Sequence, residues 1–290
     1  MRPLFIKMKI VKIISQFFSK DYLLNMKKFI LLLICMILFI SLKVDKNKTI
    51  LWKNGAKAAI CLTYDDGMQT QIENAIPQLD EVGLKGTFFI NSVSGTASII
   101  AWKNAAKSGH ELGNHSLFHP CPSSFGWPKE IASENYTIPQ ILNEIKTVNL
   151  ILENLDPNRK KRSYSYPCNQ TEVGGKSYIE ALRKSKLVYC ARGGSGAEKI
   201  FVSNFSMFNR MNVPSWAVPE NVELKDLIDF VEKAKEKGGL AVIQFHGIGG
   251  EWIKVSNETH KAFLRYLSEN KSEYWVATFS EIVEFIEKDK

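Results

Sequence analysis

Residues 58–67 read AAICLTYDDG, an uninterrupted apolar run that ends in two carboxylates and a glycine. A short apolar run bounded by turn residues is typical of a strand that is buried on both faces. Six further short apolar runs follow, and amphipathic stretches separate them. Alternation of strands with helices predicts a parallel sheet with crossover helices.

The expected strands and helices follow from apolar periodicity and from turn residues at their ends. The strands cover Ala58–Tyr64, Gly86–Ile90, Glu111–Asn114, Tyr164–Pro167, Leu187–Cys190, Leu240–Phe245 and Tyr274–Thr278, and the helices cover Gln69–Val82, Pro139–Leu155, Leu224–Lys237, Thr259–Glu269 and Ser280–Glu287. About seven such units predict an α/β fold with a closed or nearly closed (β/α) barrel. A doubly wound open sheet is the alternative.

The net charge of +8 is confined to the N-terminus. Residues 1–50 hold ten Lys and Arg against two Asp and Glu, which leaves 28 of each sign in residues 51–290. A neutral domain behind a basic tail argues against nucleic-acid binding.

Phe29–Leu42 (FILLLICMILFISL) follows Lys27 and Lys28 and has the form of an export signal. Its 14 residues are few for a membrane span of about 20. A cleaved signal and an uncleaved anchor both remain open, as does a start at Met1 or at Met26. We expect residues 1–45 to be this segment, the only membrane contact. Residues 50–288 form the expected catalytic domain, exported and either membrane-anchored or periplasmic or extracellular.

Polar residues gather where the expected strands end, which is where α/β barrels carry their active sites. Asp65 and Asp66 follow the first strand, His115 and His119 follow the third, and His246 follows LAVIQF. Histidines four residues apart on one face of a helical turn reach a single metal ion at about 2.0–2.1 Å. Each feature alone has a plainer reading, an Asp-Asp-Gly helix cap or unrelated histidines, but together they favour a metal site.

Four motifs in this order, TYDDG, HSLFHP, YPCNQ and IQFH, resemble those of the NodB-homology polysaccharide deacetylases, carbohydrate esterase family 4. The resemblance covers about residues 55–285. It implies a distorted (β/α) barrel and a divalent metal cofactor, with zinc expected. It also implies an acetylated carbohydrate as partner and removal of acetyl groups from N-acetylglucosamine polymers or O-acetylated xylan.

Carried over to this chain, the resemblance makes Asp65 the general base and His246 the general acid. It makes Asp66, His115 and His119 the metal ligands. The water's proton would pass to the base, and the metal would polarise the acetyl carbonyl.

The third motif departs from the family, which has an arginine where Ser165 stands. Arg162 and Arg192 are the two candidates to orient the base in its place. The backbone N–H of Cys168 is the expected oxyanion donor, and Tyr166 and Trp216 are further candidates for contact with the oxyanion or the substrate.

The fourth motif departs as well, because Asn212 stands where the family has an aspartate that tunes the acid histidine. A weaker acid suits an alcohol leaving group better than an amine, which tilts the expectation slightly toward an O-acetyl ester. Trp127 and Trp252 are additional candidates for a sugar platform. A Cys121–Cys168 disulfide is left open.

Two other functions remain possible on this sequence. One is a carbohydrate-binding relative that keeps the metal site but has lost turnover. The other is a metal-free amidohydrolase on the same barrel, which a complete Asp/His/His set disfavours. The oligomeric state has no signal in the sequence.

Overall fold

The computed structural model describes residues 24–33, 50–93, 95–194 and 198–289. The chain divides into two parts between Lys46 and Asn47. In the first part, residues 24–33 form a helix. Within the described ranges, no helix is both long and apolar enough to cross a membrane. Most of the expected export segment, residues 34–42, lies outside the described residues.

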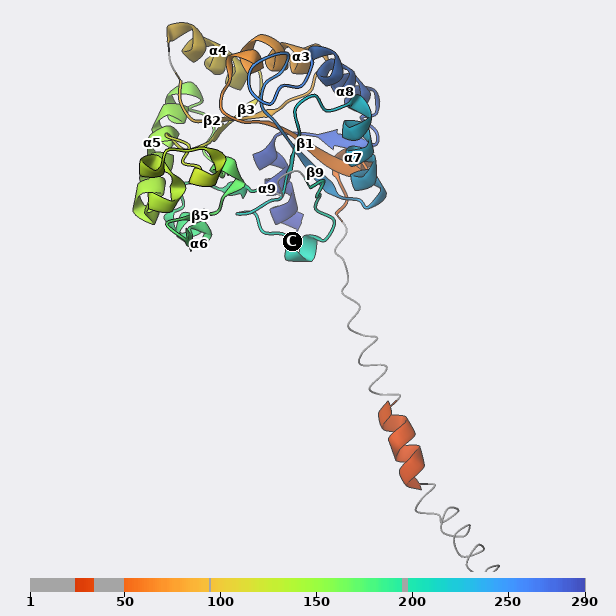
Figure 1. Cartoon of the computed structure of the whole chain (residues 1–290). Helices are drawn as coiled ribbons and strands as arrows, with labels where there is room; N and C mark the ends of the chain where they lie inside the picture. The colour runs from red at the N-terminus through yellow and green to blue at the C-terminus, as the bar shows by residue number, and fades with distance from the viewer. Residues whose placement is uncertain (1–23, 34–49, 94, 195–197, 290) are drawn as a thin grey trace, which may run out of the picture. The chain divides into compact units, whose positions relative to one another are not determined.

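The second part alternates strands and helices along the chain (Figure 1). Its strands are β1 (Ala58–Tyr64), β2 (Thr87–Ile90), β3 (Glu111–Asn114), β4 (Ser163–Ser165), β5 (Glu172–Val173), β6 (Lys176–Ser177), β7 (Cys190–Arg192), β8 (Trp216–Ala217), β9 (Leu240–Phe245) and β10 (Tyr274–Val276). Its α-helices are α3 (Ile76–Glu81), α4 (Thr96–Lys107), α5 (Ile138–Leu155), α6 (Ile179–Ser185), α7 (Leu224–Glu236), α8 (Asn257–Glu269) and α9 (Phe279–Asp289). A π-helical turn, Gln71–Ala75, precedes α3, and β5 and β6 form a separate antiparallel pair.

The main sheet is parallel and runs in the order β7-β4-β3-β2-β1-β9-β8. Strand β10 pairs with the first half of β1, whereas β2 pairs with the last two residues of β1. At the other edge, Val213 bridges to Arg192 of β7, and Trp216 pairs with β9 three residues later. The segment that contains β8 therefore links both edges of the sheet and nearly closes the barrel.

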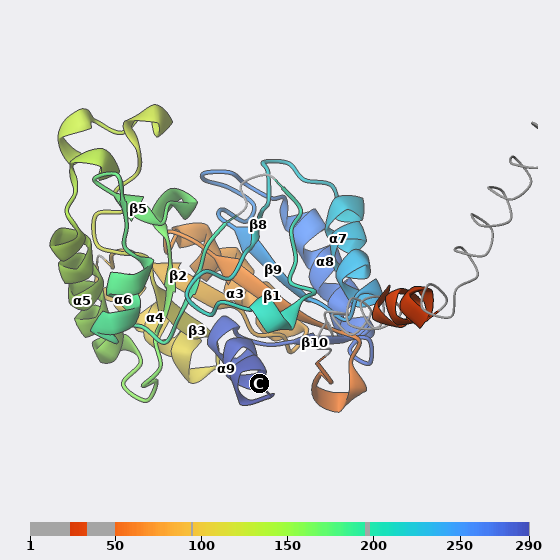
Figure 2. The same ribbon diagram turned by 90° about the horizontal axis from the view of Figure 1, so that it is seen from below.

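Helices surround the sheet, with α5 and α6 at one edge and α7 and α8 at the other (Figures 1 and 2). All seven residues of β1 are buried. Alternate side chains of β1 belong to different cores, because successive strand residues point to opposite faces. Ile60, Leu62 and Tyr64 pack in the cluster under the outer helices, and Cys61 packs in the cluster that contains α9.

This topology confirms the expected (β/α) barrel and excludes the alternative of a doubly wound open sheet. Three strands, β1, β3 and β9, have the expected bounds. Helix α4, helix α6 and strand β8 were not expected. The strand expected at Leu187–Cys190 is shifted along the chain and spans Cys190–Arg192.

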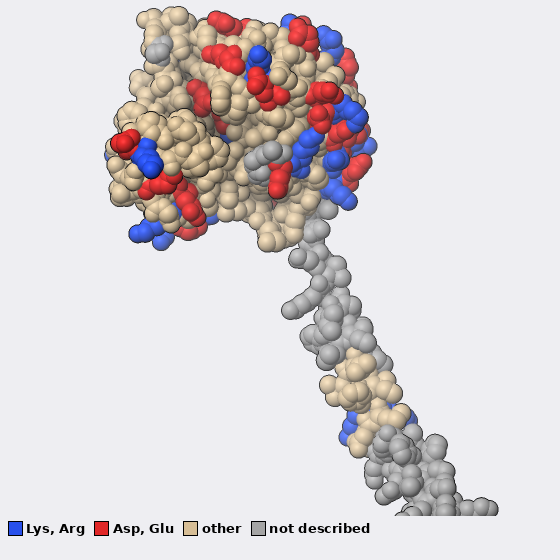
Figure 3. Space-filling view, in the orientation of Figure 1, with Lys and Arg blue, Asp and Glu red and all other residues tan. Residues whose placement is uncertain are grey.

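The visible face of the second part mixes acidic and basic side chains, most densely over α7 and α8 (Figure 3). This mixture agrees with the balanced composition of residues 51–290. No single-sign patch suited to a polyanion is apparent on that face.

Candidate metal centre and active site

A cavity of about 810 Å³ opens at the carboxyl ends of the strands. It is lined by Asp65, Asp66, Met68, Asn91, His115, Phe118, His119, Phe125, Trp127, Cys168, Asn169, Ala217, Val218, Pro219, Gln244, His246, Trp252 and Ile253. The five residues expected as ligands, base and acid all line it. Up to 181 residues separate them in the sequence, and the parallel sheet brings them together.

Three of these side chains converge on one point. The Nε2 atoms of His115 and His119 lie 3.1 Å apart. Asp66 Oδ1 lies 3.5 Å from His115 Nε2 and 3.6 Å from His119 Nε2. Ligands about 2.0–2.2 Å from a tetrahedral zinc ion lie about 3.3–3.6 Å from each other. Both Asp–His distances lie in this range and the His–His distance is slightly shorter, so the spacing is close to that of a metal site, and the Asp/His/His chemistry fits a divalent cation.

His115 and His119 lie in a loop. The prediction that they lie on one helical turn is wrong. Residues 115–120 are not helical. Ser116 and His119 both have left-handed backbones, with φ of 57° and 51°. Asp66 is left-handed too, with φ of 75°. Such conformations cost energy for residues other than glycine and persist where surrounding contacts impose them.

Strand β4 and helix α5 supply those contacts. His115 Nδ1 lies 2.9 Å from the carbonyl oxygen of Ser165, so Nδ1 carries the proton and Nε2 keeps its lone pair for a metal. The buried carboxylate of Glu144 accepts hydrogen bonds from the backbone N–H groups of Leu117 and Phe118. The loop is therefore held on both sides of the ligand pair.

The electrostatics of the three groups also suit a cation. Burial lowers the pKa of His115 to about 3 and lowers the pKa of His119, so both imidazoles are neutral at neutral pH. Burial and the charge of Asp65 raise the pKa of Asp66 to about 6. A partly buried carboxylate beside two neutral imidazoles would be stabilised by a bound cation.

Asp65 has a different environment from its neighbour. Its Oδ2 accepts hydrogen bonds from Arg192 Nη2 at 2.5 Å and from Gln244 Nε2 at 3.0 Å. Burial opposes ionisation, but the charges of Arg192 and of the nearby histidines outweigh it, so the pKa of Asp65 is lowered. Its Oδ1 is buried and has no partner among the described residues. Oδ1 is the oxygen left to accept a proton.

Arg192 reaches the base and Arg162 does not. Arg192 is fully buried and also donates to the hydroxyls of Thr63 and Ser165. Ser165 and Arg192 are register partners on neighbouring strands, so the short serine leaves room for the arginine. Arg162 instead donates to the carbonyl oxygens of Leu152 and Asp156, away from the cavity.

Gln244 was not anticipated as a site residue. It lies on β9 two residues before His246, which follows the strand, and both residues line the cavity. That offset was the available signal. Gln71 adds a second link here, because its amide donates to the carbonyl oxygens of Asp65 and His246 and ties β1 to β9.

Two expected contact residues do not reach the cavity. Tyr166 is fully buried and donates its hydroxyl to the carbonyl oxygen of Met211. Trp216 is 1% exposed and packs against Phe230 with ring centroids 4.9 Å apart. Both are core residues and pack in the hydrophobic clusters of the barrel.

Other aromatic side chains form the rim of the cavity. Phe118, Phe125 and Trp252 line it and are 69%, 60% and 66% exposed. Trp127 lies against His119, with ring centroids 5.9 Å apart. Trp252 is flanked by Glu251 and Ile253, whose φ values of 64° and 44° are unusual, especially for a β-branched residue. The carboxylate of Glu251 accepts hydrogen bonds from Thr70 and holds this loop.

A disulfide joins Cys121 to Cys168. It links the loop that carries His115 and His119 to the loop after β4. Both sulfurs also lie near His119, but joined sulfurs are not thiolates, so this group is not a second metal site. Cys168 has a left-handed backbone, with φ of 49°, and lines the cavity.

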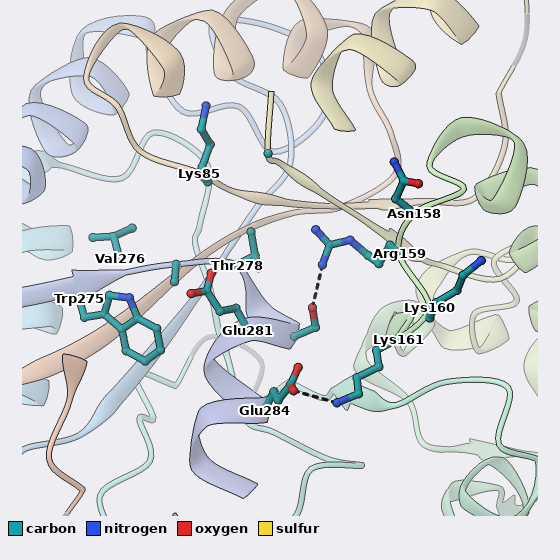
Figure 4. Close-up of a pocket in the computed structure, with 13 residues that line it drawn as sticks. Lys85, Asn158, Arg159, Lys160, Lys161, Trp275, Val276, Thr278, Glu281 and Glu284 are labelled. Carbon is teal, nitrogen blue, oxygen red and sulfur yellow. Dashed lines mark hydrogen bonds and ion pairs between the residues drawn. The ribbon is translucent and has the colours of Figure 1, made fainter. Parts of the chain in front are cut away.

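A second cavity, of about 590 Å³, lies at the amino ends of the strands (Figure 4). Arg159 points into it and donates to the hydroxyl of Ser280, and Lys161 pairs with Glu284. None of the residues proposed above lines it. It is therefore separate from the candidate active site.

Comparison with known proteins relates the sequence and the fold to one family. Residues 53–182 match the family model described as polysaccharide deacetylase. This part of the chain resembles the polysaccharide deacetylase family, and it makes up less than half of the sequence. Arg192, Gln244 and His246 lie beyond the matched residues. No curated protein matches the sequence.

Solved structures share the fold. A Mycobacterium smegmatis protein assigned to the polysaccharide deacetylases superposes with a TM-score of 0.60 at 13% identity, over 83% of this chain and 94% of that one. The CE4 domain of a multidomain xylanase from the hindgut metagenome of Trinervitermes trinervoides gives 0.50 at 18% identity, over 81% and 91%. At these identities the likeness is one of fold.

The disulfide closes a loop of 47 residues. Replacing both cysteines (Cys121→Ala with Cys168→Ala) is expected to lower the free energy of unfolding by about 2–4 kcal/mol, because the unfolded chain regains the entropy of that loop. Urea denaturation measures the loss. Dithiothreitol should destabilise the wild type by a similar amount and leave the double variant unchanged. Equal sensitivity of both proteins to the reductant would contradict the assignment.

Proposed function

We propose that this protein is a polysaccharide deacetylase, a metal-dependent hydrolase that removes acetyl groups from carbohydrate. The observation that carries the proposal is the convergence of Asp66, His115 and His119 beside Asp65. One carboxylate faces the two neutral imidazoles. The other is ion-paired through one oxygen and leaves the second oxygen free.

In this proposal Asp66, His115 and His119 hold a divalent metal, with zinc expected from two nitrogen ligands and one oxygen ligand. When bound, the metal would act as a Lewis acid toward the acetyl carbonyl and would bind the attacking water. Asp65 is the general base and uses Oδ1. Arg192 and Gln244 fix Oδ2, so the carboxylate has one orientation and stays ionised.

The backbone N–H of Cys168 is proposed as the oxyanion donor. A backbone donor held by a disulfide and a left-handed conformation needs little reorganisation as negative charge develops on the carbonyl oxygen. His246 occupies the position of the leaving-group donor, because it lines the cavity from the end of β9.

The exposed aromatic rim supports a carbohydrate substrate. Flat apolar rings such as Trp252 and Phe118 offer stacking faces to sugars, and a cavity of about 810 Å³ has room for more than an acetyl group. The rim extends the site beyond the reacting centre, which favours an oligosaccharide or polymer.

We also propose that residues 50–288 act outside the cytoplasm, either anchored or released. The support is the basic and apolar N-terminal sequence, Lys27 to Leu42, with the form of an export signal. The disulfide agrees with an oxidising compartment.

The two other candidate functions have less support. A binding protein without turnover has no need for a base held by a buried arginine. A metal-free amidohydrolase leaves the Asp66–His115–His119 group without a role.

Variants at the two aspartates separate ligand from base. Asp66→Asn and His119→Gln are expected to lose bound zinc, whereas Asp65→Asn should keep zinc and lower kcat for acetate release by about a hundredfold or more. Zinc is measured by elemental analysis after dialysis, and acetate by a coupled assay. His110→Gln is the matched histidine control, since His110 is buried outside the cavity. Loss of zinc from Asp65→Asn would overturn the assignment of roles.

Trp252→Ala tests the rim. Loss of one stacking face is expected to raise KM for an acetylated oligosaccharide by about fivefold, from the order of 1 kcal/mol for such a contact. KM for a small acetyl ester such as 4-nitrophenyl acetate should not change, because that molecule does not reach the rim. Leu51→Ala is the control for loss of an exposed apolar residue far from the cavity. Equal effects on both substrates would contradict the role of the rim.

A further inference from the structure

Side chains hold the backbone of the loop that carries His115 and His119. The N–H of His115 donates to the carbonyl oxygen of Ile90 on β2. The next four N–H groups, those of residues 116–119, each donate to a side-chain oxygen over 2.8–3.2 Å. The shape of the loop therefore depends on these acceptor side chains rather than on the hydrogen bonds of a sheet or helix.

Glu144 is the acceptor that comes from outside the loop. Its Oε2 accepts a hydrogen bond from the N–H of Leu117 at 3.2 Å and from the N–H of Phe118 at 3.0 Å. The other two acceptors, Asn114 and Ser116, lie next to the loop or within it. Glu144 therefore ties the middle of the loop directly to α5.

Helix α5 gives Glu144 a fixed position. The helix has 18 residues and begins with a capping box at Thr137. Glu144 is 6% exposed, and Ile145 beside it is fully buried. The amide of Asn114 donates to the carbonyl oxygen of Ile145 and to the side chain of Asn149, which fastens the end of β3 to the same helix. An acceptor on a packed helix holds a loop more precisely than an acceptor on another loop.

The loop needs such a support because its conformation is unfavourable. Ser116 and His119 have φ values of 57° and 51°, which cost energy for residues that carry a Cβ atom. Without Glu144, two N–H groups would lose their acceptor, and the loop could relax to a right-handed backbone. Relaxation would move the ring of His119 relative to the ring of His115, which is held through its Nδ1 by β4.

Glu144 acts from behind the loop. It is not among the residues that line the cavity, whereas Asp66, His115 and His119 all line it. Its carboxylate could influence a metal ion in two ways. One is the reach of its oxygen to the two N–H groups, and the other is the negative charge that it places near the site.

We infer that Glu144 is a positioning residue for the metal ligands. By accepting two N–H groups of the loop, it holds His115 and His119 at the spacing of the site before the metal arrives, and so raises the affinity for zinc. This inference rests on the proposed function, because it takes these histidines and Asp66 as the ligands. Groups that orient metal ligands typically contribute about 10–100-fold to metal affinity.

Two substitutions separate reach from charge. Glu144→Asp keeps the charge but shortens the side chain by one methylene, so its oxygens no longer reach both N–H groups from α5. Glu144→Gln removes the charge but keeps the length and an oxygen that accepts. The dissociation constant for zinc is measured on the full-length protein by competition with a chromophoric chelator. Urea denaturation in the presence of EDTA records any loss of stability separately.

Glu144→Asp is expected to bind zinc about tenfold or more weakly than the wild type, and Glu144→Gln within about threefold of it. Glu134→Asp is the matched control. Glu134 is exposed and accepts a hydrogen bond from the backbone N–H of Ser123, which is the same kind of contact outside the ligand loop. This control should bind zinc as the wild type does.

Three other results would contradict the inference. Wild-type affinity in Glu144→Asp would show that Glu144 serves only the stability of the fold, and the proposed function would stand. Weaker binding by Glu144→Gln than by Glu144→Asp would assign the effect to charge instead of position. Absence of zinc binding by the wild type would overturn the proposed function and this inference together.

Hydrogen exchange of the metal-free wild type is a second test and needs no variant. A loop that is held ready predicts that the amides of Leu117 and Phe118, followed by NMR, exchange slowly before zinc is added, within about tenfold of their rates with zinc. Exchange as fast as in an unstructured peptide until zinc binds would show that the metal, rather than Glu144, orders the loop.

Discussion

The buried ion pair between Asp65 and Arg192 is the constraint on which the site depends. It spans the barrel interior from β1 to β7, and both side chains are almost completely buried. A buried pair is stable only when the remaining polar atoms are satisfied, and removal of one partner costs about 3–5 kcal/mol. Thr63, Ser165 and Gln244 provide hydrogen bonds around it. The Phe89 ring lies 5.1 Å from the guanidinium carbon and covers one side.

This ion pair gives two adjacent carboxylates different properties. The positive charge of Arg192 stabilises the ionised carboxylate of Asp65 and lowers its pKa. Asp66 has no such partner, and its pKa is raised to about 6. Paired acids whose pKa values are pushed apart generally have separate roles in catalysis. The account of Asp65 as base and Asp66 as ligand follows from that division.

Much of the fold was predictable because its central strands are uninterrupted apolar runs, as in β1 and β9. Helix α4 was missed because it begins after Gly95 without a side-chain cap and contains Ser98, Ile99 and Ile100, which are modest helix formers. Strand β8 has two residues, too few for a periodic signal. Trp216 was therefore taken as a candidate for contact with the substrate, whereas it packs in the core.

The site was predictable in its residues more than in its geometry. Motif spacing brought Asp66, His115 and His119 together, but left-handed residues such as Ser116 have no sequence signal, so the loop was taken for a helical turn. The choice between Arg162 and Arg192 needed the register of β4 against β7. Gln244 escaped notice because its partner, Asp65, lies 179 residues away.

Anomalous X-ray diffraction at the zinc absorption edge, on crystals grown with zinc, tests the central claim most directly. The account predicts one strong peak in the cavity, about 2.0–2.2 Å from Asp66 Oδ1, His115 Nε2 and His119 Nε2, with Asp65 outside bonding distance. No peak among these three atoms, or a metal bonded to Asp65, would contradict it.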